Sequence, residues 1–198
     1  MAKLFAPAAE RNKEAIYEVL CKWVPKSGNI LEIASGTGQH VVYFAEKFPK
    51  LNWLPSDIDQ EHLECIDERV KESGLTNIIA ASKIDTTSSS WAIKGIDLIF
   101  CANMIHISPF KSTIGLIEGS SRALKSSGVL VLYGPFKENG VETCESNLNF
   151  DESLRLRDSS WGLRNKEEVE KIASENNLIL SQRYEMPANN LILVFEKK

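Results

Sequence analysis

The segment from Glu32 to Gln39, "EIASGTGQ", combines residue types that bind a nucleotide-like cofactor: a carboxylate, small residues and the glycines Gly36 and Gly38. The residues before it are apolar and β-branched, as in a buried strand of a parallel sheet, and the apolar residues after it recur at helical spacing. A strand-to-helix turn faces the crevice at the carboxyl ends of the strands, where glycines let a ligand approach the backbone and the helix presents free N–H groups. We therefore expect a cofactor at this turn.

The details of the turn favour S-adenosylmethionine (SAM) over a dinucleotide. A dinucleotide site has a third glycine in the pattern G-x-G-x-x-G, and this chain has Val41 at that position. Glu32, close to the turn, would also repel a pyrophosphate. SAM has no phosphate; its ammonium and sulfonium groups suit a nearby carboxylate, and its own carboxylate suits a helix N-terminus.

Two aspartates end the next two predicted strands, so they should face the same crevice. Asp57 follows Gly36 by about 20 residues, the spacing at which an acidic residue accepts hydrogen bonds from ribose hydroxyls. Asp85 could accept a hydrogen bond from an adenine amino group. The alternative for both is a capping or turn role, which is common for Asp at such positions.

The end of the fourth predicted strand, "CANMIHISPF", contains the candidate catalytic residues Asn103 and His106. Methyl transfer from SAM needs a nucleophile aligned with the methyl carbon and, for some acceptors, removal of a proton. With a reference pKa of about 6.5, His106 could act as general base for a hydroxyl, thiol or amine. Alternatively, His106 caps the next segment or bonds a backbone carbonyl. His40 and His62 are more typical of structural or solvent-facing positions.

Strand and helix patterns alternate around these residues, which is typical of a parallel sheet with helices on both faces. Strands are expected at 29–33, 51–59, 77–85, 95–107 and 128–136, and helices near 16–23, 41–48, 61–75 and 113–125. Asn165 and Glu168 predict a capped helix reaching about Glu175. Two last strands, 178–186 and 190–198, flank the turn "PANN" and predict an antiparallel hairpin. The fold expected is α/β: a Rossmann-like, doubly wound seven-stranded sheet, mostly parallel.

Three segments complete the expected organisation of residues 1–198 as one domain. Residues 1–28 form an N-terminal helical segment, in which "AERNKE" is either a solvated face or a strap over the crevice, with Arg11 paired to the carboxylate of SAM. Residues 137–163 are polar, lack a clear period and exceed the usual length of a structureless loop. We interpret them as a lid or substrate-side insertion, the alternative being a crossover without a role.

Composition restricts the partners. The net charge is -4 and no block of Lys or Arg exceeds two residues, so a nucleic acid is not expected. No apolar stretch approaches the roughly 18 residues of a membrane span. The four cysteines lie far apart without a CxxC pair, which favours reduced thiols in a cytoplasmic protein and, with three dispersed histidines, no metal site. The expected partner is a small, neutral or cationic molecule.

The glycine turn, Asp57, Asp85 and the strand order closing on a hairpin resemble class I SAM-dependent methyltransferases. The segments "PAAERNKE", "LEIASGTGQH", "PSDID", "ANMIHISPF", "LYGPFKENG", "WGLRNKEEVE" and "MPANNL" resemble more narrowly the methyltransferase-like protein twenty-six group, which carries a domain of unknown function. The resemblance implies a SAM site at Glu32, Gly36, Gly38, Asp57 and Asp85 and a methyltransferase reaction that yields S-adenosylhomocysteine (SAH).

Two departures from the broad family matter. The family usually has glycine at the position of Ala34, and an added Cβ there narrows the approach to the backbone. The Asn/Asp-Pro-Pro-aromatic signature of enzymes that methylate nucleobase or glutamine nitrogens is missing after the fourth strand, which favours a small-molecule acceptor. Two other functions stay open: a catalytically silent SAM-binding sensor or partner protein and, disfavoured by Val41 and Glu32, a nicotinamide-dependent oxidoreductase.

Overall fold

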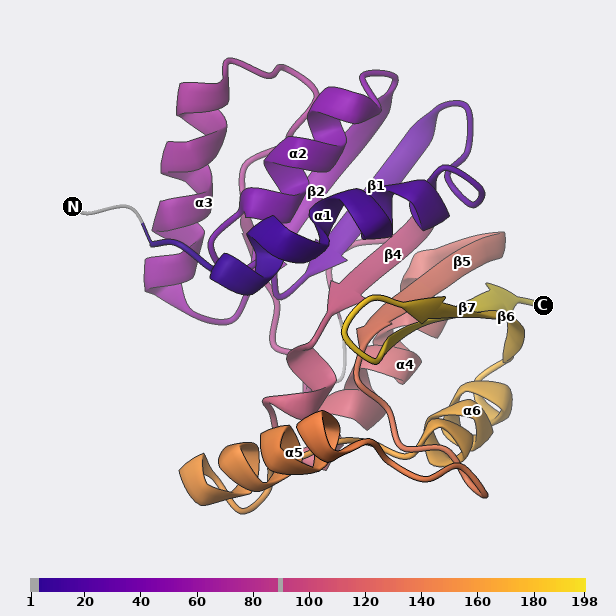
Figure 1. Ribbon diagram of the computed structural model, residues 1–198. Coiled ribbons are helices and arrows are strands. Elements are labelled where there is room, and N and C mark those ends of the chain that lie inside the picture. Colours follow the sequence, from indigo (N-terminus) through magenta and orange to yellow (C-terminus); the bar gives the residue numbers. More distant parts are fainter. Residues whose placement is uncertain (1–3, 89–90) are drawn as a thin grey trace.

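Seven strands form one mixed sheet in the computed structural model, which describes residues 4–88 and 91–198 (Figure 1). Residues 1–3 of the expected N-terminal segment lie outside the described residues. The strands are β1 (Gly28–Ile33), β2 (Leu51–Asp57), β3 (Ser82–Lys83), β4 (Ile96–Ala102), β5 (Leu124–Gly134), β6 (Leu178–Met186) and β7 (Asn190–Lys197). Their order is β3-β2-β1-β4-β5-β7-β6; the first five are parallel neighbours, and β7 pairs antiparallel with both β5 and β6. The predicted fold class is confirmed.

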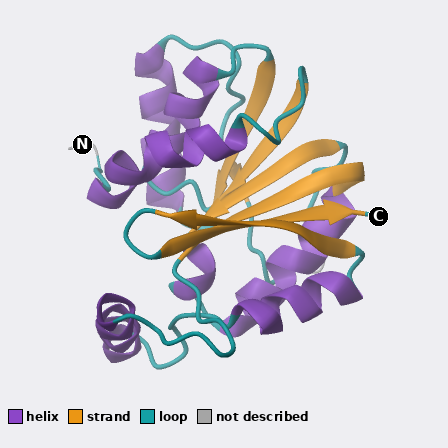
Figure 2. Cartoon of the chain, turned by 45° about the vertical axis from the view of Figure 1, so that its right-hand side comes forward, coloured by secondary structure: helices purple, strands orange, loops and turns teal. Residues whose placement is uncertain are grey.

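Helices cover both faces of the sheet, as Figures 1 and 2 show. They are α1 (Pro7–Leu20), α2 (Gln39–Lys47), α3 (Gln60–Ser73), α4 (Phe110–Ala123), α5 (Glu145–Arg157) and α6 (Lys166–Glu175), with a short 3₁₀ helix, η1 (Met104–His106). Apolar residues of α1, α2 and α3 pack in one core cluster with one face of the sheet, and those of α4 and α6 pack against the other face. No helix in the described ranges is long and apolar enough to cross a membrane.

Two strand predictions were too long. The strand expected at 77–85 is reduced to Ser82–Lys83 and a single bridge from Ile78 to β2. Its apolar appearance was misleading, because Ile79 is 52% exposed at this edge of the sheet. The strand expected at 95–107 ends at Ala102, because Asn103 adopts a left-handed backbone (φ 60°) and turns the chain into η1.

The segment 137–163 contains helix α5, although the sequence predicted no regular structure there. The helix has no apolar stripe: its buried residues are Asn147, Asp151 and Leu154, of which only Leu154 is apolar. A hydrophobic period therefore could not reveal it. By contrast, the capping signal for α6 is confirmed, since the Asn165 side chain accepts a hydrogen bond from the Glu168 amide.

Candidate functional site

The turn after β1 has the open, left-handed backbone that a cofactor cradle requires. Gly36 and Gly38 have φ values of 55° and 73°, and Gly38 caps the start of α2. A Cβ on Gly36 would meet no described atom within 4 Å, whereas one on Gly38 would lie 3.2 Å from the Ile66 Cα. Gly36 thus presents its backbone to open space, and Gly38 allows α2 and α3 to approach each other. Ala34 also has a left-handed backbone, with φ 56°, which explains the advantage of glycine at this position.

Asp57 joins the ends of β1 and β2. Its Oδ2 accepts a hydrogen bond from the Gly36 amide at 2.9 Å, and its Oδ1 accepts one from the Asp59 amide at 3.0 Å. His62 Nδ1 lies 3.2 Å from the same Oδ1. Each carboxylate oxygen has two lone pairs, so these contacts leave room for hydroxyl donors. The turn role and the predicted ribose-binding role of Asp57 are therefore compatible.

Glu32 is a buried carboxyl, 2% exposed, at the carboxyl end of β1. Its Oε2 has no hydrogen-bond partner among the described residues, and its Oε1 lies 3.7 Å from His40 Nδ1. Burial raises the pKa of Glu32 to about 8, so the neutral acid predominates at pH 7. The charge repulsion that the sequence suggested between Glu32 and a pyrophosphate is consequently weaker than expected.

His40 connects Glu32 to α1. Its Nε2 lies 2.7 Å from Asn12 Oδ1, which accepts the ring N–H and leaves Nδ1 as the nitrogen that faces Glu32. Burial lowers the pKa of His40 to about 4. The imidazole is therefore neutral at pH 7, and a protonated Glu32 is the species that can donate toward it. His40 is buried and structural, which confirms one of the two roles that the sequence left open.

The N-terminal half of α1 is fixed to the first turn of α2. Gln39 Oε1 accepts a hydrogen bond from the Ala6 amide at 2.6 Å, and Gln39 Nε2 donates to Glu10 Oε2 at 3.2 Å. Sequence analysis assigned no role to Gln39, because the residues of α1 that satisfy it lie about 30 positions earlier. Burial raises the pKa of Tyr133 in β5, and the positive charge of Arg11, which is exposed on α1, partly offsets this effect. The strap role of this segment and the pairing of Arg11 with SAM stay predictions.

Asp85 forms a local turn. Its Oδ1 accepts hydrogen bonds from the amide and hydroxyl of Thr87 at 2.8 and 2.7 Å, which hold the pKa of this carboxyl below its usual value. Asp85 thus has a turn role and does not cap a helix, since no described helix lies between β3 and β4. Its role toward an adenine amino group stays a prediction.

Asn103 and His106 lie in the turn that follows β4. The Asn103 amide donates to the Tyr133 carbonyl at 2.8 Å, and its carbonyl accepts from the His106 amide at 3.0 Å. A Cβ on Gly134 would lie 2.5 Å from His106 Nε2 and 3.3 Å from Asn103 Oδ1. The missing side chain of Gly134 therefore makes room for both candidate catalytic residues.

The environment of His106 is that of a neutral, packed imidazole. The ring is fully buried, and burial, together with the charge of Arg164, lowers its pKa to about 3. Its Nδ1 accepts a hydrogen bond from the Arg164 amide at 3.3 Å, so the ring proton resides on Nε2, which has no partner within the described chain. Nδ1 is thus occupied and Nε2 already protonated, which disfavours proton abstraction by this ring. The partner of Nδ1 is a backbone N–H and not the backbone carbonyl that the alternative named.

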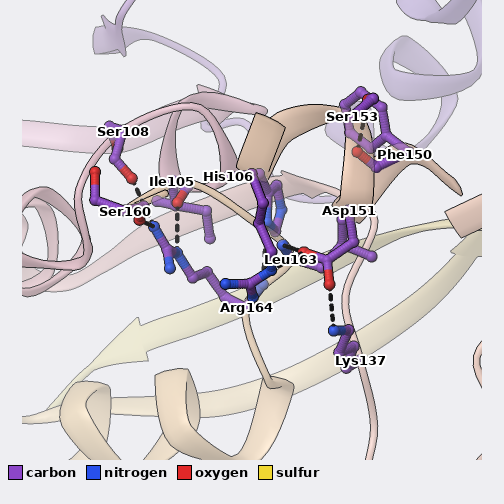
Figure 3. Close-up of polar contacts among 11 residues, drawn as sticks. Ile105, His106, Ser108, Lys137, Phe150, Asp151, Ser153, Ser160, Leu163 and Arg164 are labelled. Carbon is purple, nitrogen blue, oxygen red and sulfur yellow. Dashed lines mark hydrogen bonds and ion pairs between the residues drawn. The ribbon is translucent and has the colours of Figure 1, made fainter. Parts of the chain in front are cut away.

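Arg164 and Asp151 attach the 137–163 segment to this turn (Figure 3). The Arg164 guanidinium donates to the carbonyls of Ile105 and Ser108 at 2.8 and 2.6 Å. Asp151 of α5 accepts a hydrogen bond from the Leu163 amide at 2.8 Å and forms an ion pair with Lys137. The sequence gave no indication of Arg164, because its ligands are backbone carbonyls. Both ends of the segment are therefore fixed next to the end of β4.

Solved structures with the same fold include several methyltransferases. An O-methyltransferase family 2 protein from Planctomyces limnophilus, in complex with apigenin, matches with a TM-score of 0.83 and 17% identity over 96% of this chain and 58% of its own. The apo S-adenosylmethionine-dependent methyltransferase SibL matches with a TM-score of 0.78 and 14% identity, over 96% of this chain and 55% of its own. The YcgJ protein of Bacillus subtilis matches with a TM-score of 0.73 and 15% identity, over 96% of this chain and 99% of its own. This chain spans a little over half the length of the first two. At these identities the likeness concerns the fold.

The matches show that this chain has the same fold as these methyltransferase structures. Residues 3–197 match the family described as "Protein of unknown function (DUF938)". The chain belongs to this family.

Proposed function

We propose that this protein binds SAM at the carboxyl ends of β1, β2 and β3 and transfers its methyl group to a small molecule. The observation that carries the proposal is the Gly36–Asp57 hydrogen bond. It joins the open backbone of the glycine turn to a carboxylate on the next strand, so the turn that would admit the cofactor lies beside an acceptor for its ribose hydroxyls. Named methyltransferases with the same fold support it, as does the resemblance to the methyltransferase-like protein twenty-six group.

Each predicted residue has a role in this proposal. Gly36 and Gly38 admit the cofactor to the backbone at the start of α2, and Ala34 narrows that approach by one methyl group. Asp57 accepts hydrogen bonds from the ribose hydroxyls, and Asp85 accepts a hydrogen bond from the adenine amino group. These assignments concern groups that already lie at one edge of the sheet.

The methionine part of the cofactor falls between Glu32 and α1. The ammonium of SAM faces the buried Glu32 carboxyl, whose Oε2 lacks a partner within the described chain. Arg11, exposed on α1, pairs with the cofactor carboxylate. An ammonium close to Glu32 favours its ionised form, because opposite charges stabilise each other.

The chemical step is a displacement at the methyl carbon. When bound, SAM would supply its methyl group to a lone pair of the acceptor; the carbon–sulfur bond would break, and sulfur would keep the electron pair as SAH. A proton of the acceptor would pass to solvent, since His106 Nε2 already holds a proton. In this proposal Asn103 and the 137–163 segment align the acceptor, which is sufficient for an acceptor that reacts without a protein base.

A second function, SAM binding without turnover in a sensor or partner protein, is favoured by one observation. His106, the candidate base with a reference pKa near neutrality, is fully buried with its pKa lowered to about 3. A methyltransferase that relies on alignment and a silent binder have the same cofactor site, so only turnover separates them.

The test begins with calorimetry. SAM and SAH should bind and NAD should not. Asp57→Ala should lower SAM affinity by about 10- to 150-fold, the loss of charge-assisted hydrogen bonds to two hydroxyls. Asp59→Ala is the matched control, because Asp59 caps α3 through the Glu61 amide and is exposed. An unchanged affinity in the Asp57 variant would remove this carboxylate from the site. Incorporation of isotopic methyl into a metabolite mixture then separates the enzyme from the binder.

A further inference from the structure

A cavity of about 310 Å³ opens beyond the carboxyl end of β5, between residues 136–147 and the β6–β7 hairpin. This volume lies at the lower end of the range for small-molecule sites. Phe136, Met186 and Leu191 form apolar parts of its wall, and polar side chains complete it. Phe136 lines the cavity, whereas Tyr133 packs in the core cluster on the opposite face of the sheet.

The charged groups of the cavity carry an excess of negative charge. Glu138 and Arg183 form a bidentate pair, with nitrogen–oxygen distances of 2.7 and 2.8 Å, and therefore neutralise each other. Glu185 makes a longer contact of 3.3 Å with the same guanidinium. Glu142 also lines the cavity and has no ion-pair partner in residues 4–88 and 91–198. A bound anion would be repelled here, whereas a cation would be attracted.

The cavity is connected by packing to the turn that follows β4. The Phe136 ring stands edge-on to the His106 ring, with centroids 4.9 Å apart, and His106 in turn lies against Gly134 beside Asn103. The opposite wall is fixed as well, because the buried Asn147 of α5 donates to the Asn189 carbonyl of the hairpin at 2.9 Å. This contact accounts for a buried amide on a helix whose buried residues are mostly polar.

We propose that this cavity binds the methyl acceptor, and that the acceptor is a small organic cation whose ammonium group lies near Glu142 and Glu185 while its apolar part contacts Phe136 and Met186. The ammonium has no lone pair, so it is the recognised group, and a second, uncharged group of the same molecule accepts the methyl. The assignment of the occupant as the acceptor rests on the proposed function. The assignment of its chemical class rests on the volume, the charge and the apolar wall of the cavity.

Cys144 provides a direct measure of occupancy. It lines the cavity, and a hydrogen bond from Ser146, followed by the Asn147 amide, lowers the pKa of its thiol. Dithiodipyridine, a neutral disulfide that does not react with amines, should therefore modify it readily. Cys21 is exposed at the end of α1, outside the cavity lining, and is the internal reference when both modified peptides are quantified by mass spectrometry.

The probes are pentylamine, pentanol and pentanoate, which share an alkyl chain and differ in charge. At neutral pH, pentylamine should slow modification of Cys144 by at least about twofold, as occupancy of one half or more requires, and should leave Cys21 unchanged. Pentanol and pentanoate should have no such effect. Protection should be lost in Glu142→Gln and retained in Glu152→Gln, which removes an exposed carboxylate of α5 outside the cavity.

The outcomes separate this inference from the proposed function. Equal protection of Cys144 by all three probes would overturn the assignment of a cation site. So would the lack of protection by any probe, if it is found both with and without SAH. Retained protection in Glu142→Gln would also overturn it. Selective protection by pentylamine in a protein that fails to bind SAH would support the cation site and refute the proposed function. Selective protection together with SAH binding supports both.

Discussion

Glu32→Gln tests the central electrostatic feature of the site, a buried carboxyl that is protonated at neutral pH. The substitution keeps the size of the side chain and removes its ionisation. Burial raises the pKa of Glu32 from 4.5 to about 8, so the folded protein binds one more proton than the unfolded chain between these pH values. The free energy of unfolding of the wild type should consequently fall as pH rises from 4.5 to 8. The glutamine variant lacks this contribution.

The size of the effect follows from the shift. At about 1.4 kcal/mol per pKa unit, raising the pKa from 4.5 to about 8 corresponds to at most roughly 5 kcal/mol. Rearrangement around the ionised carboxylate and entry of water reduce this value, so we expect a change of at least about 2 kcal/mol. The amide also leaves polar atoms without partners, as Oε2 is now. That cost does not depend on pH.

The assay is urea unfolding of both proteins at pH 5, 6.5, 8 and 9. Relative to the wild type, Glu32→Gln should gain stability steadily across this range and level off above pH 8. His40, with its pKa lowered to about 4, stays neutral throughout, and the remaining groups are common to both proteins. Glu118→Gln on the exposed side of α4 is the control and should show no gain. If the stabilities of wild type and Glu32→Gln ran parallel from pH 5 to 9, the reasoning about burial would be wrong.

Three further predictions concern the same edge of the sheet. The affinity for SAH should rise severalfold from pH 6 to 8 in the wild type but not in Glu32→Gln, because the ammonium of SAH binds the ionised form of Glu32. A wild-type affinity that calorimetry finds unchanged across this pH range would contradict the prediction. Nitrogen NMR should show a neutral His106 ring with Nε2 protonated from pH 7.5 to 5.5. Because the pKa of His106 is lowered to about 3, the contribution of this residue to stability is lost as pH falls from 6.5 toward 3. Titration of His106 near pH 6.5 would refute this prediction. Gly134→Ala, with its Cβ 2.5 Å from His106 Nε2, should lower stability by about 1 to 3 kcal/mol in thermal unfolding, and an unchanged melting temperature would show that the ring moves freely.

Features that depend on local chemistry could be predicted from the sequence. The glycine turn, the capped helix at Lys166–Glu175 and the terminal hairpin follow from residue types at fixed offsets, and the structure has each of them. Helix α5 could not be found in this way. It is fixed by Asp151 and Asn147 through polar contacts to residues distant along the chain, and such contacts leave no hydrophobic period.

Charge states were harder to predict than positions. Glu32 and His106 both lie at strand ends, as expected, but the sequence does not show how deeply each side chain is buried. Burial depends on which helices pack above the residue: α1 and α2 bring Asn12 and His40 over Glu32, and the segment after α5 brings Arg164 against His106. A carboxylate and a base predicted from reference pKa values therefore become a neutral acid and a neutral imidazole.

The two buried groups divide the carboxyl edge of the sheet into two regions. On the side of α1 and β1, Glu32 can ionise near neutral pH when a cation approaches, so a positive cofactor group can be bound there without a permanent buried charge. On the side of β5 and α5, Glu142 and Glu185 are exposed to solvent, which screens their attraction for a ligand and suits a mobile cation that must enter and leave. Between them lie His106 and Gly134, closely packed and uncharged. If SAM binds as proposed, these uncharged residues would add no fixed negative charge that stabilises its sulfonium over the neutral thioether of SAH.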